Sequence, residues 1–346
     1  MPRKFSNNKI KDAGKILSKP LNYTEAEIND AQDKLTYWRT IHSTPLNTFQ
    51  TTLRRKIKQL NLVDCITAQR LKRVDSIIKK LNRFSNMKLS TMQDIAGIRA
   101  IVKDLNDVNI LEENFLNSRM KHSTLSYNDY IENPKIDGYR GKHIIFEYCS
   151  ENNEIDKLKV ELQIRTKLQH IWATTVETIG IFLDQPLKSS IGPQNWLNYF
   201  SLVSAGFSII EGTKIHEKYS HLTHKEIFTK IVEESLVLEI SPKLRGFTVA
   251  ADHIMNKNYK GKYNLIILNL DKRVVKVKNY TAKNYTQANI DYTQIEREID
   301  KGANLQAVLV STDSIGSLEK AFPSYFLDSQ EYLQKLNEIN ALLKTL

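Results

Sequence analysis

Three short segments of this 346-residue chain alternate apolar with polar side chains, and this pattern restricts the fold more than any other feature. The segments are DIAGIRAIV (94–102), HIIFEY (143–148) and VELQIRT (160–166). A period of two residues is typical of a β-strand with one buried and one polar face. Such a polar face can simply meet water, but arginine, histidine, glutamate and glutamine together favour an active surface.

Helical periodicity flanks these strands. Apolar residues recur near every 3.6 positions before Pro45, and further helices are expected over about 46–60, 107–119 and 168–179. The segment 70–83 is expected to be partly helical. The length exceeds one ordinary core and predicts at least two domains.

The pattern changes after about residue 220. Residues 225–240 predict an amphipathic helix ending at Pro242, and a further helix is expected over about 246–256. YNLIILNL and RVVKVKNY predict a β-hairpin turning at Asp271 and Lys272, followed by a helix over about 285–300, the strand LQAVLVS and one or two closing helices. We therefore expect a catalytic domain over 1–220, a helical linker over 221–245 and a smaller α-β-β-α-β-α domain over 246–346.

Composition excludes several classes of protein. No apolar run approaches the roughly 18 residues of a membrane span, and the charged start has no apolar signal region. Two cysteines, Cys65 and Cys149, cannot build a disulfide framework or a four-cysteine zinc site, and no cysteine lies near His221 and His224. These features predict a cytoplasmic protein without zinc and without membrane attachment.

Basic residues are concentrated at one end of the chain. The formal charge is +11, yet residues 1–100 hold 20 Lys and Arg against 8 Asp and Glu, so the whole excess lies there. This asymmetry indicates binding of nucleotide phosphates, of a nucleic acid backbone, or of both. The cations Arg54, Arg55 and Lys58 of one predicted helix fit a phosphate-binding surface and a solvated basic face equally well.

No familiar phosphate motif accounts for this charge. The chain has no GxxxxGK[ST] loop, no GxGxxG, no HExxH and no His-Asp pair. It does carry cations at positions 70, 72, 80 and 83, a hydroxyl at Ser76, and the hard oxygen ligands Asp94 and Glu161. Cations, a hydroxyl and paired carboxylates are what phosphoryl transfer with magnesium needs.

These segments resemble a known family when they are taken in order. RLKRVDSIIKKLNR, DIAGIRAIV, DYIENPKIDGYRGKH and VELQIRTKLQHIWATTVE resemble the RelA/SpoT synthetase domain over about residues 70–180. The resemblance implies an α/β (α+β) fold of the nucleotidyltransferase type, with a mixed β-sheet flanked by helices. It also implies transfer of the β,γ-pyrophosphate of ATP to a ribose 3′-hydroxyl, with Mg²⁺.

The resemblance assigns roles by position. Asp94 and Glu161 match the magnesium ligands, and Glu161 also matches the group that activates the acceptor hydroxyl. Tyr139 matches the ring that stacks on the acceptor base. The implied ATP-binding residues are Arg70, Lys72, Ser76, Lys80, Arg83 and Arg99, and the residues implied around the acceptor are Lys135, His143, Gln163 and Arg165.

One departure affects the acceptor. Small alarmone synthetases usually read G-Y-R-S-x-H, whereas this chain has Gly141 in place of the serine. A guanine nucleotide acceptor is therefore in question.

The downstream part, about 120 residues, resembles the antitoxin half of the CapRel fused toxin–antitoxin proteins, a phage-defence group among the toxic small alarmone synthetases. The resemblance rests on YNLIILNLDKRVVKVKNY, LQAVLVS and AFPSYFLD. It implies that the 3′-CCA end of tRNA is the acceptor, that the C-terminal domain masks the ATP site, and that a phage capsid protein relieves the block. Phe322 and Tyr325, on either side of Pro323, are the aromatic residues expected to mask the site.

Two other interpretations stay open. The chain can be an ordinary small alarmone synthetase that makes (p)ppGpp or (p)ppApp, or an RNA-binding module without catalysis. Asp94, Tyr139 and Glu161 argue against the second of these. The sequence leaves the oligomeric state undecided.

Overall fold

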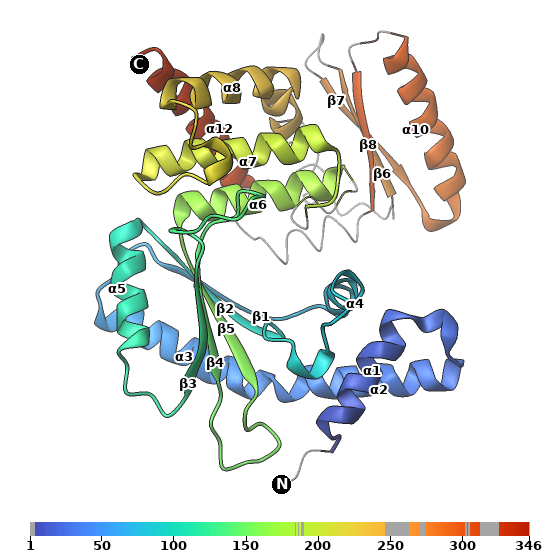
Figure 1. Ribbon diagram of the computed structural model, residues 1–346. Coiled ribbons are helices and arrows are strands. Elements are labelled where there is room, and N and C mark those ends of the chain that lie inside the picture. The colour runs from blue at the N-terminus through green and yellow to red at the C-terminus, as the bar shows by residue number, and fades with distance from the viewer. Residues whose placement is uncertain are drawn as a thin grey trace. The chain divides into compact units, whose positions relative to one another are not determined.

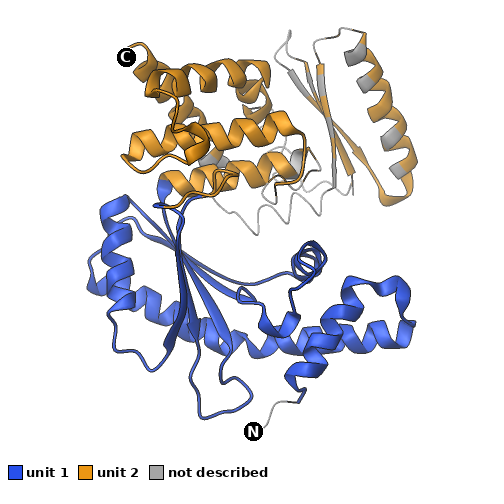
Figure 2. Cartoon of the chain, viewed as in Figure 1, with its two compact units in different colours: residues 1–132, 140–167 blue, residues 133–139, 168–346 orange. Residues whose placement is uncertain are grey.

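The computed structural model describes residues 4–183, 185, 187, 190–245, 263–269, 274–301, 303, 305–311 and 325–345. The chain forms two compact units, which are coloured separately in Figure 2. Unit 1 comprises residues 1–132 and 140–167, and unit 2 comprises residues 133–139 and 168–346. A short loop inside the sequence of unit 1 therefore belongs to unit 2. This division by contacts differs from the predicted domain boundaries at 220 and 245, which stay a prediction.

Unit 1 is built on a five-stranded mixed sheet with the strand order β1-β2-β5-β4-β3 (Figure 1). Its strands are β1 (Ile66–Leu71), β2 (Ala96–Val102), β3 (Ser123–Asp129), β4 (Lys142–Glu147) and β5 (Lys159–Thr166). Only β2 and β5 run parallel among these neighbours; the other pairs are antiparallel. The α+β fold expected from the sequence is confirmed.

Helices of unit 1 pack on this sheet and beside it. They are α1 (Asn7–Ser18), α2 (Glu25–Ile41), α3 (Ser43–Gln59), α4 (Val74–Arg83) and α5 (Leu105–Leu116), with the short 3-10 turns η1 (Pro20–Asn22) and η2 (Leu89–Thr91). One core joins α3 and α5 to the apolar face of β2, β4 and β5, where Ile98, Leu162 and Ile144 are at most 1% exposed. Each such side chain stabilises the fold by roughly 1.5–3 kcal/mol through burial. A second core joins α1, α2 and α4.

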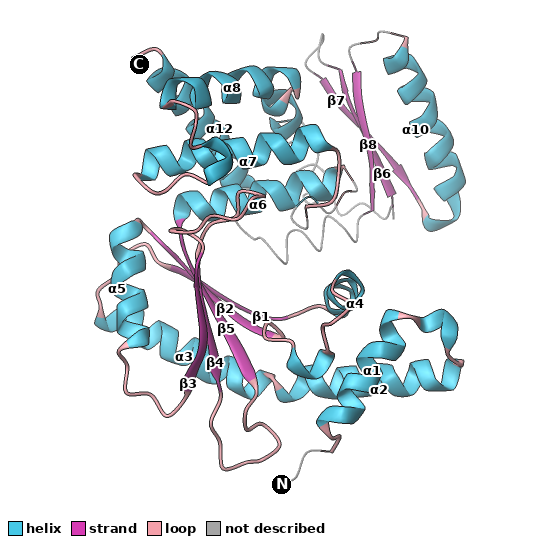
Figure 3. Cartoon of the chain, in the orientation of Figure 1, coloured by secondary structure: helices cyan, strands magenta, loops and turns pink. Residues whose placement is uncertain are grey.

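Unit 2 contains helices and a second, smaller sheet, which Figure 3 shows in different colours. The helices are α6 (Lys167–Phe182, of which Lys167 counts with unit 1), α7 (Gln194–Glu211), η4 (Glu217–Tyr219), α8 (His224–Val237), η5 (Ala282–Asn284), α10 (Tyr285–Asp300) and α12 (Tyr325–Leu343). The antiparallel sheet β7-β6-β8 consists of β6 (Tyr263–Asn269), β7 (Val274–Tyr280) and β8 (Leu305–Ser311). The expected hairpin, the helix over 285–300 and the strand LQAVLVS are thus confirmed.

Several expectations need correction. The structure adds α1, β1, β3 and α7, which the periodicity did not predict. Helix α3 starts at Ser43, before Pro45, because proline is tolerated in the first turn, where its missing N–H is not needed. Helix α8 ends at Val237, five residues before the predicted stop at Pro242. The predicted helix over about 246–256 and the hairpin turn at Asp271 and Lys272 lie outside the described residues.

No helix in the described part of the chain has the length and apolar character that crossing a bilayer requires.

Candidate active site

The polar face of the unit 1 sheet gathers the predicted site residues of three strands. In the strand register Gly97 is opposite Glu161, and Arg99 is opposite Gln163, across the parallel pair β2 and β5. His143 of β4 is also opposite Gln163. Directly opposite residues share one face of a sheet, so these side chains lie on the face turned away from the α3 and α5 core. Arg70 pairs with Gly97 and shares that face.

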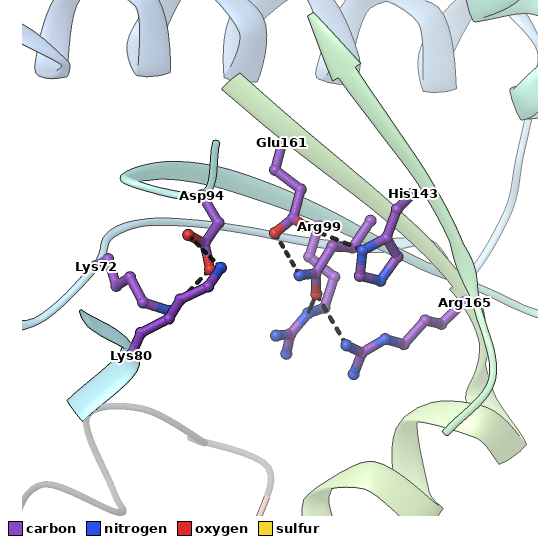
Figure 4. Close-up of polar contacts among 8 residues, drawn as sticks. Lys72, Lys80, Asp94, Arg99, His143, Glu161 and Arg165 are labelled. Carbon is purple, nitrogen blue, oxygen red and sulfur yellow. Dashed lines mark hydrogen bonds and ion pairs between the residues drawn. The ribbon is translucent and has the colours of Figure 1, made fainter. Parts of the chain in front are cut away.

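Glu161 is held by two neighbours on this face (Figure 4). Its Oε1 lies 2.9 Å from His143 Nδ1, and its Oε2 accepts a hydrogen bond from Gln163 Nε2 at 2.7 Å. The pKa of Glu161 is lowered to about 2. Burial by itself raises this pKa, but the contacts with His143 and Gln163 and the charge of nearby Lys80 lower it by more. Glu161 is therefore a buried carboxylate that stays ionised at neutral pH.

Gln163 connects Glu161 to two arginines. Its Oε1 accepts from Arg165 Nη2 at 2.9 Å and from Arg99 Nε at 3.4 Å. The amide cannot rotate without breaking bonds at both of its ends, because its nitrogen faces Glu161 and its oxygen faces the arginines. Gln163 therefore fixes the orientation of Glu161 as well as contributing its own polar atoms.

Asp94 forms the second acidic position, two residues before the start of β2. It makes ion pairs with Lys72 at 2.8 Å and with Lys80 at 2.9 Å (Figure 4). Burial and the charge of Glu161 raise the pKa of Asp94, and the two lysines lower it, with a net decrease. The effect of Glu161 on this pKa indicates that the two carboxylates lie within one electrostatic neighbourhood.

Lys72 and Lys80 come from two different elements. Lys72 directly follows β1, and its backbone N–H donates to Ile95 O at 2.8 Å, which ties the end of β1 to the start of β2. Lys80 lies on α4, whose apolar residues Ile77 and Leu81 are buried. Burial of these apolar residues fixes α4 so that Lys80 reaches Asp94.

The two carboxylates suit a magnesium ion. Mg²⁺ prefers hard oxygen ligands, and it usually takes one or two protein carboxylates together with phosphates and water. Asp94 and Glu161 provide ionised oxygens in one neighbourhood, so the residues present fit this ion. Among the described residues no group of three or more His, Cys, Asp or Glu side chains has the arrangement of a metal site.

The remaining ATP-binding candidates are exposed. Three of them in unit 1 are exposed to solvent: Arg70, Ser76 and Arg83. The Arg83 guanidinium lies 5.0 Å from the centre of the Phe84 ring, and Phe84 is itself 44% exposed. These groups are accessible to a ligand, whereas Asp94 and Glu161 are largely covered.

Tyr139 and Lys135 belong to unit 2, in the loop 133–139. The Lys135 ammonium lies 5.2 Å from the centre of the Tyr139 ring, and Tyr139 is only 9% exposed. One face of the ring therefore already has a cationic partner. A base that stacks on Tyr139 has to use the other face or displace Lys135.

The three cations predicted to form a basic surface all lie on α3. Arg54, Arg55 and Lys58 are exposed, as a polyanion surface requires. Lys56 of the same run is buried and donates to Asn114 Oδ1 at 2.7 Å. It is a structural residue, and only the other three can meet a ligand.

The predicted masking residues cannot be located. Phe322 lies outside the described residues, and Tyr325 is the first residue of α12, whose side chain at that position also lies outside them. Their role stays a prediction.

Two residues with specific contacts were missed in the sequence, one beside the site and one on the opposite face of the sheet. Tyr130 packs edge-on against His143, with 5.2 Å between the ring centres. Lys142 is 8% exposed and forms ion pairs with Glu112 and with Asp129, the latter at 3.2 Å. The signal for Lys142 was available, since it occupies a buried position in the alternation of β4.

Part of the chain is similar to known proteins. Residues 69–179 match the family described as "Region found in RelA / SpoT proteins". GTP pyrophosphokinase YjbM of Bacillus subtilis is 37% identical over 114 residues, which are 32% of this chain and 54% of that protein. GTP pyrophosphokinase YwaC of the same organism is 34% identical over 135 residues, which are 36% of this chain and 62% of that protein. The chain thus spans less than two thirds of the length of these curated relatives.

Among solved structures, small alarmone synthetase 1 of Bacillus subtilis bound to its product pppGpp is 24% identical. The match covers 52% of this chain and 94% of that chain, with a TM-score of 0.46. The matches therefore show a region found in RelA / SpoT proteins over residues 69–179.

Proposed function

We propose that this chain, which carries a RelA/SpoT synthetase region, is an ATP-dependent pyrophosphotransferase acting on a ribose 3′-hydroxyl. The observation that carries the proposal is the Glu161 carboxylate held by His143 and Gln163, with Asp94 and its two paired lysines at the start of the neighbouring strand β2. Catalysis of phosphoryl transfer consists mainly of positioning and charge stabilisation, which such a preorganised polar face supplies.

In the proposed reaction, the acceptor 3′-oxygen forms a bond to the β-phosphorus of ATP. The bond between that phosphorus and the oxygen bridging to the α-phosphate breaks, AMP leaves with that oxygen, and the hydroxyl proton is released to solvent. Lys72, Lys80 and Arg83 neutralise the phosphate charges, and Arg70 and Arg99 hold the adenine. A bound Mg²⁺, held by Asp94 and Glu161, would add further neutralisation of the phosphates.

Glu161 accepts a hydrogen bond from the acceptor hydroxyl in this proposal. A side chain with a pKa of about 2 is a weak general base, because proton transfer is most efficient when the pKa lies near the working pH. We therefore assign Glu161 mainly to orienting the hydroxyl and to stabilising charge, and less to removing the proton in advance.

The acceptor is proposed to be the 3′-CCA end of tRNA, which would block translation. The exposed cations Arg54, Arg55 and Lys58 support this choice, since a tRNA stem needs a basic surface beyond a nucleotide pocket. Gly141, in place of the usual serine, also favours an altered acceptor. The second candidate is a guanine nucleotide, which the names of the two relatives favour.

The experiment uses the full chain with ATP labelled at the γ-phosphate and either tRNA, GTP or GDP. Label in tRNA supports the first acceptor, and label in a nucleotide product alone supports the second. Absence of transfer to all three by the unaltered chain and also by the Phe322→Ala/Tyr325→Ala variant, in which the block proposed below is removed, would overturn the proposed activity. The Glu161→Gln variant is the negative control.

We further propose that the C-terminal part blocks the ATP site and that a phage capsid protein relieves the block, as in the CapRel group. Phe322 and Tyr325 are the proposed masking residues, and the cytoplasm is the proposed location. The test is growth of cells that express Phe322→Ala or Tyr325→Ala without phage. At least one variant should become toxic, and adding Glu161→Gln should remove the toxicity. Harmless single and double variants, with a toxic fragment 1–220, would place the block elsewhere.

A further inference from the structure

Helix α7 holds the loop 133–139 through two serine hydroxyls. Ser201 Oγ donates to Ile136 O at 2.8 Å, and Ser204 Oγ donates to Gly138 O at 2.5 Å. Serines within helices often bond back to their own helix, as Ser208 does with Ser204 O at 3.1 Å. Ser201 and Ser204 instead direct their hydroxyls to backbone carbonyls of a distant segment.

Gly138 brings the loop close enough for these bonds. Its φ of +93° lies in the left-handed region. A Cβ at this position would lie 2.8 Å from Ser204 Cβ and 2.9 Å from Trp172 Cζ2. Trp172 is itself fixed, because its Nε1 donates to Phe200 O at 2.8 Å. A side chain larger than glycine would therefore push the loop off α7.

The loop is also closed by its own hydrogen bonds. Gly138 N donates to Lys135 O at 2.8 Å, and Tyr139 N donates to Asp137 Oδ1 at 2.9 Å. The loop thus behaves as one small turn, and whatever fixes two of its carbonyls fixes the position of Tyr139.

Helix α7, which binds the loop, is itself fixed in place by another helix. All residues from Tyr199 to Ser208 are buried. The Tyr332 hydroxyl of α12 donates to the Tyr199 hydroxyl at 3.2 Å, and the Phe207 ring packs against Tyr332 with 5.9 Å between centres. On a helix, Tyr199 projects from nearly the opposite side to Ser201 and Ser204.

We propose that Ser201 and Ser204 are positioning residues for the acceptor, because they seat the loop that carries Tyr139. The proposal rests on the proposed function, which makes Tyr139 the stacking platform for the acceptor base. Loss of the two hydroxyls removes the hydrogen bonds to the carbonyls of Ile136 and Gly138, so the loop becomes more mobile. Acceptor affinity then falls, while ATP affinity does not.

The first measurement is hydrogen exchange of the full chain, read on peptides that cover residues 131–141. Exchange should become at least several-fold faster in the Ser201→Ala/Ser204→Ala double variant. Ser208→Ala is the matched control, since it removes a buried hydroxyl from the same helix without touching the loop. Gly138→Ala, which retains both serines, should loosen the same peptides.

The second measurement is the steady-state kinetics of the same variants with tRNA and with GTP. We expect the double variant to raise KM for the acceptor roughly tenfold, with KM for ATP changed less than twofold, as two modest hydrogen bonds predict. Ser208→Ala should change neither value.

The outcomes distinguish two hypotheses: that α7 fixes the loop, and that the fixed loop contributes to acceptor binding. Unchanged exchange in both the double variant and Gly138→Ala would overturn the seating of the loop. Faster exchange with unchanged acceptor KM would overturn its role in acceptor binding. If neither the unaltered protein nor the Phe322→Ala/Tyr325→Ala variant transfers label to any acceptor, the proposed function fails, and the exchange comparison still decides whether α7 holds the loop.

Discussion

The polar face of the sheet in unit 1 and the loop 133–139 in unit 2 are built in different ways. On the sheet, side chains hold other side chains, as Gln163 holds Glu161 and is held by Arg165. In the loop, the side chains of α7 hold backbone carbonyls. The geometry of the sheet face therefore depends on the identity of its side chains, whereas the geometry of the loop depends on the position of its backbone. Substitutions should affect the two regions differently.

The largest effect is expected on the sheet. Glu161→Gln keeps the shape of the side chain but removes its charge, so transfer should fall by about a thousandfold or more. Label transfer from ATP measures the loss, and circular dichroism checks that the fold is retained. Glu113→Gln, an exposed change on α5, is the matched control. Near-normal transfer by a folded Glu161→Gln protein would contradict the assignment.

The next largest effect is expected on the free energy of unfolding and on its dependence on pH. The pKa of Glu161 is lowered from 4.5 to about 2 in the folded protein. The resulting stabilisation is fully present above the unfolded pKa and is lost as the pH falls through the folded one. Its size at neutral pH is on the order of 3 kcal/mol.

Urea unfolding at pH 7, 4.5 and 3 can measure this stabilisation. The difference in unfolding free energy between the unaltered protein and Glu161→Gln should be largest at pH 7 and clearly smaller at pH 3. A difference independent of pH would show that the contacts of Glu161 do not depend on its charge.

A smaller effect is expected in the loop. Tyr139→Ala removes the proposed stacking platform, and a base–aromatic stack contributes roughly 1–3 kcal/mol, so acceptor binding should weaken by about 10- to 100-fold. Tyr139→Phe keeps the ring and should bind nearly normally. Binding of ATP and of acceptor should be measured separately, since equal weakening of both would exclude Tyr139 as the platform.

The smallest effect is expected at the exposed cations of α3. Charge reversal at Arg54, Arg55 and Lys58 should weaken tRNA modification by about tenfold and make its salt dependence shallower, because fewer counterions are released on binding. The control reverses three exposed lysines of unit 2, Lys218, Lys225 and Lys230. The same salt slope in both triple variants would place the tRNA surface elsewhere.

The sequence predicted the sheet better than its surroundings. Strands β2, β4 and β5 have one buried and one polar face, so alternation revealed them together with Glu161, Gln163 and His143. The edge strands β1 and β3 are mostly exposed on both faces and show no such alternation. Helix α7 is buried on all sides between Tyr199 and Ser208, so it lacks the polar face that marks a surface helix.

The contacts of the loop also escaped prediction from the sequence. Ser201 and Ser204 belong to a helix far along the chain, and a serine in a buried helix usually bonds to its own backbone. Gly138 was visible in the motif, but its close approach to Trp172 depends on the tertiary structure.

The division of unit 2 between two stretches of sequence has a consequence for the growing chain on the ribosome. Ile136 is made 65 residues before Ser201, the residue that holds it, and Tyr199 is made 133 residues before Tyr332. At synthesis rates of about 5–20 residues per second, the loop waits roughly 3–13 s for α7, and α7 waits roughly 7–27 s for α12. Both carboxylates of unit 1 are synthesised before α7, and therefore before the loop 133–139 can bind to α7. A nascent chain therefore acquires its two proposed substrate sites at different times, and the acceptor site is completed last.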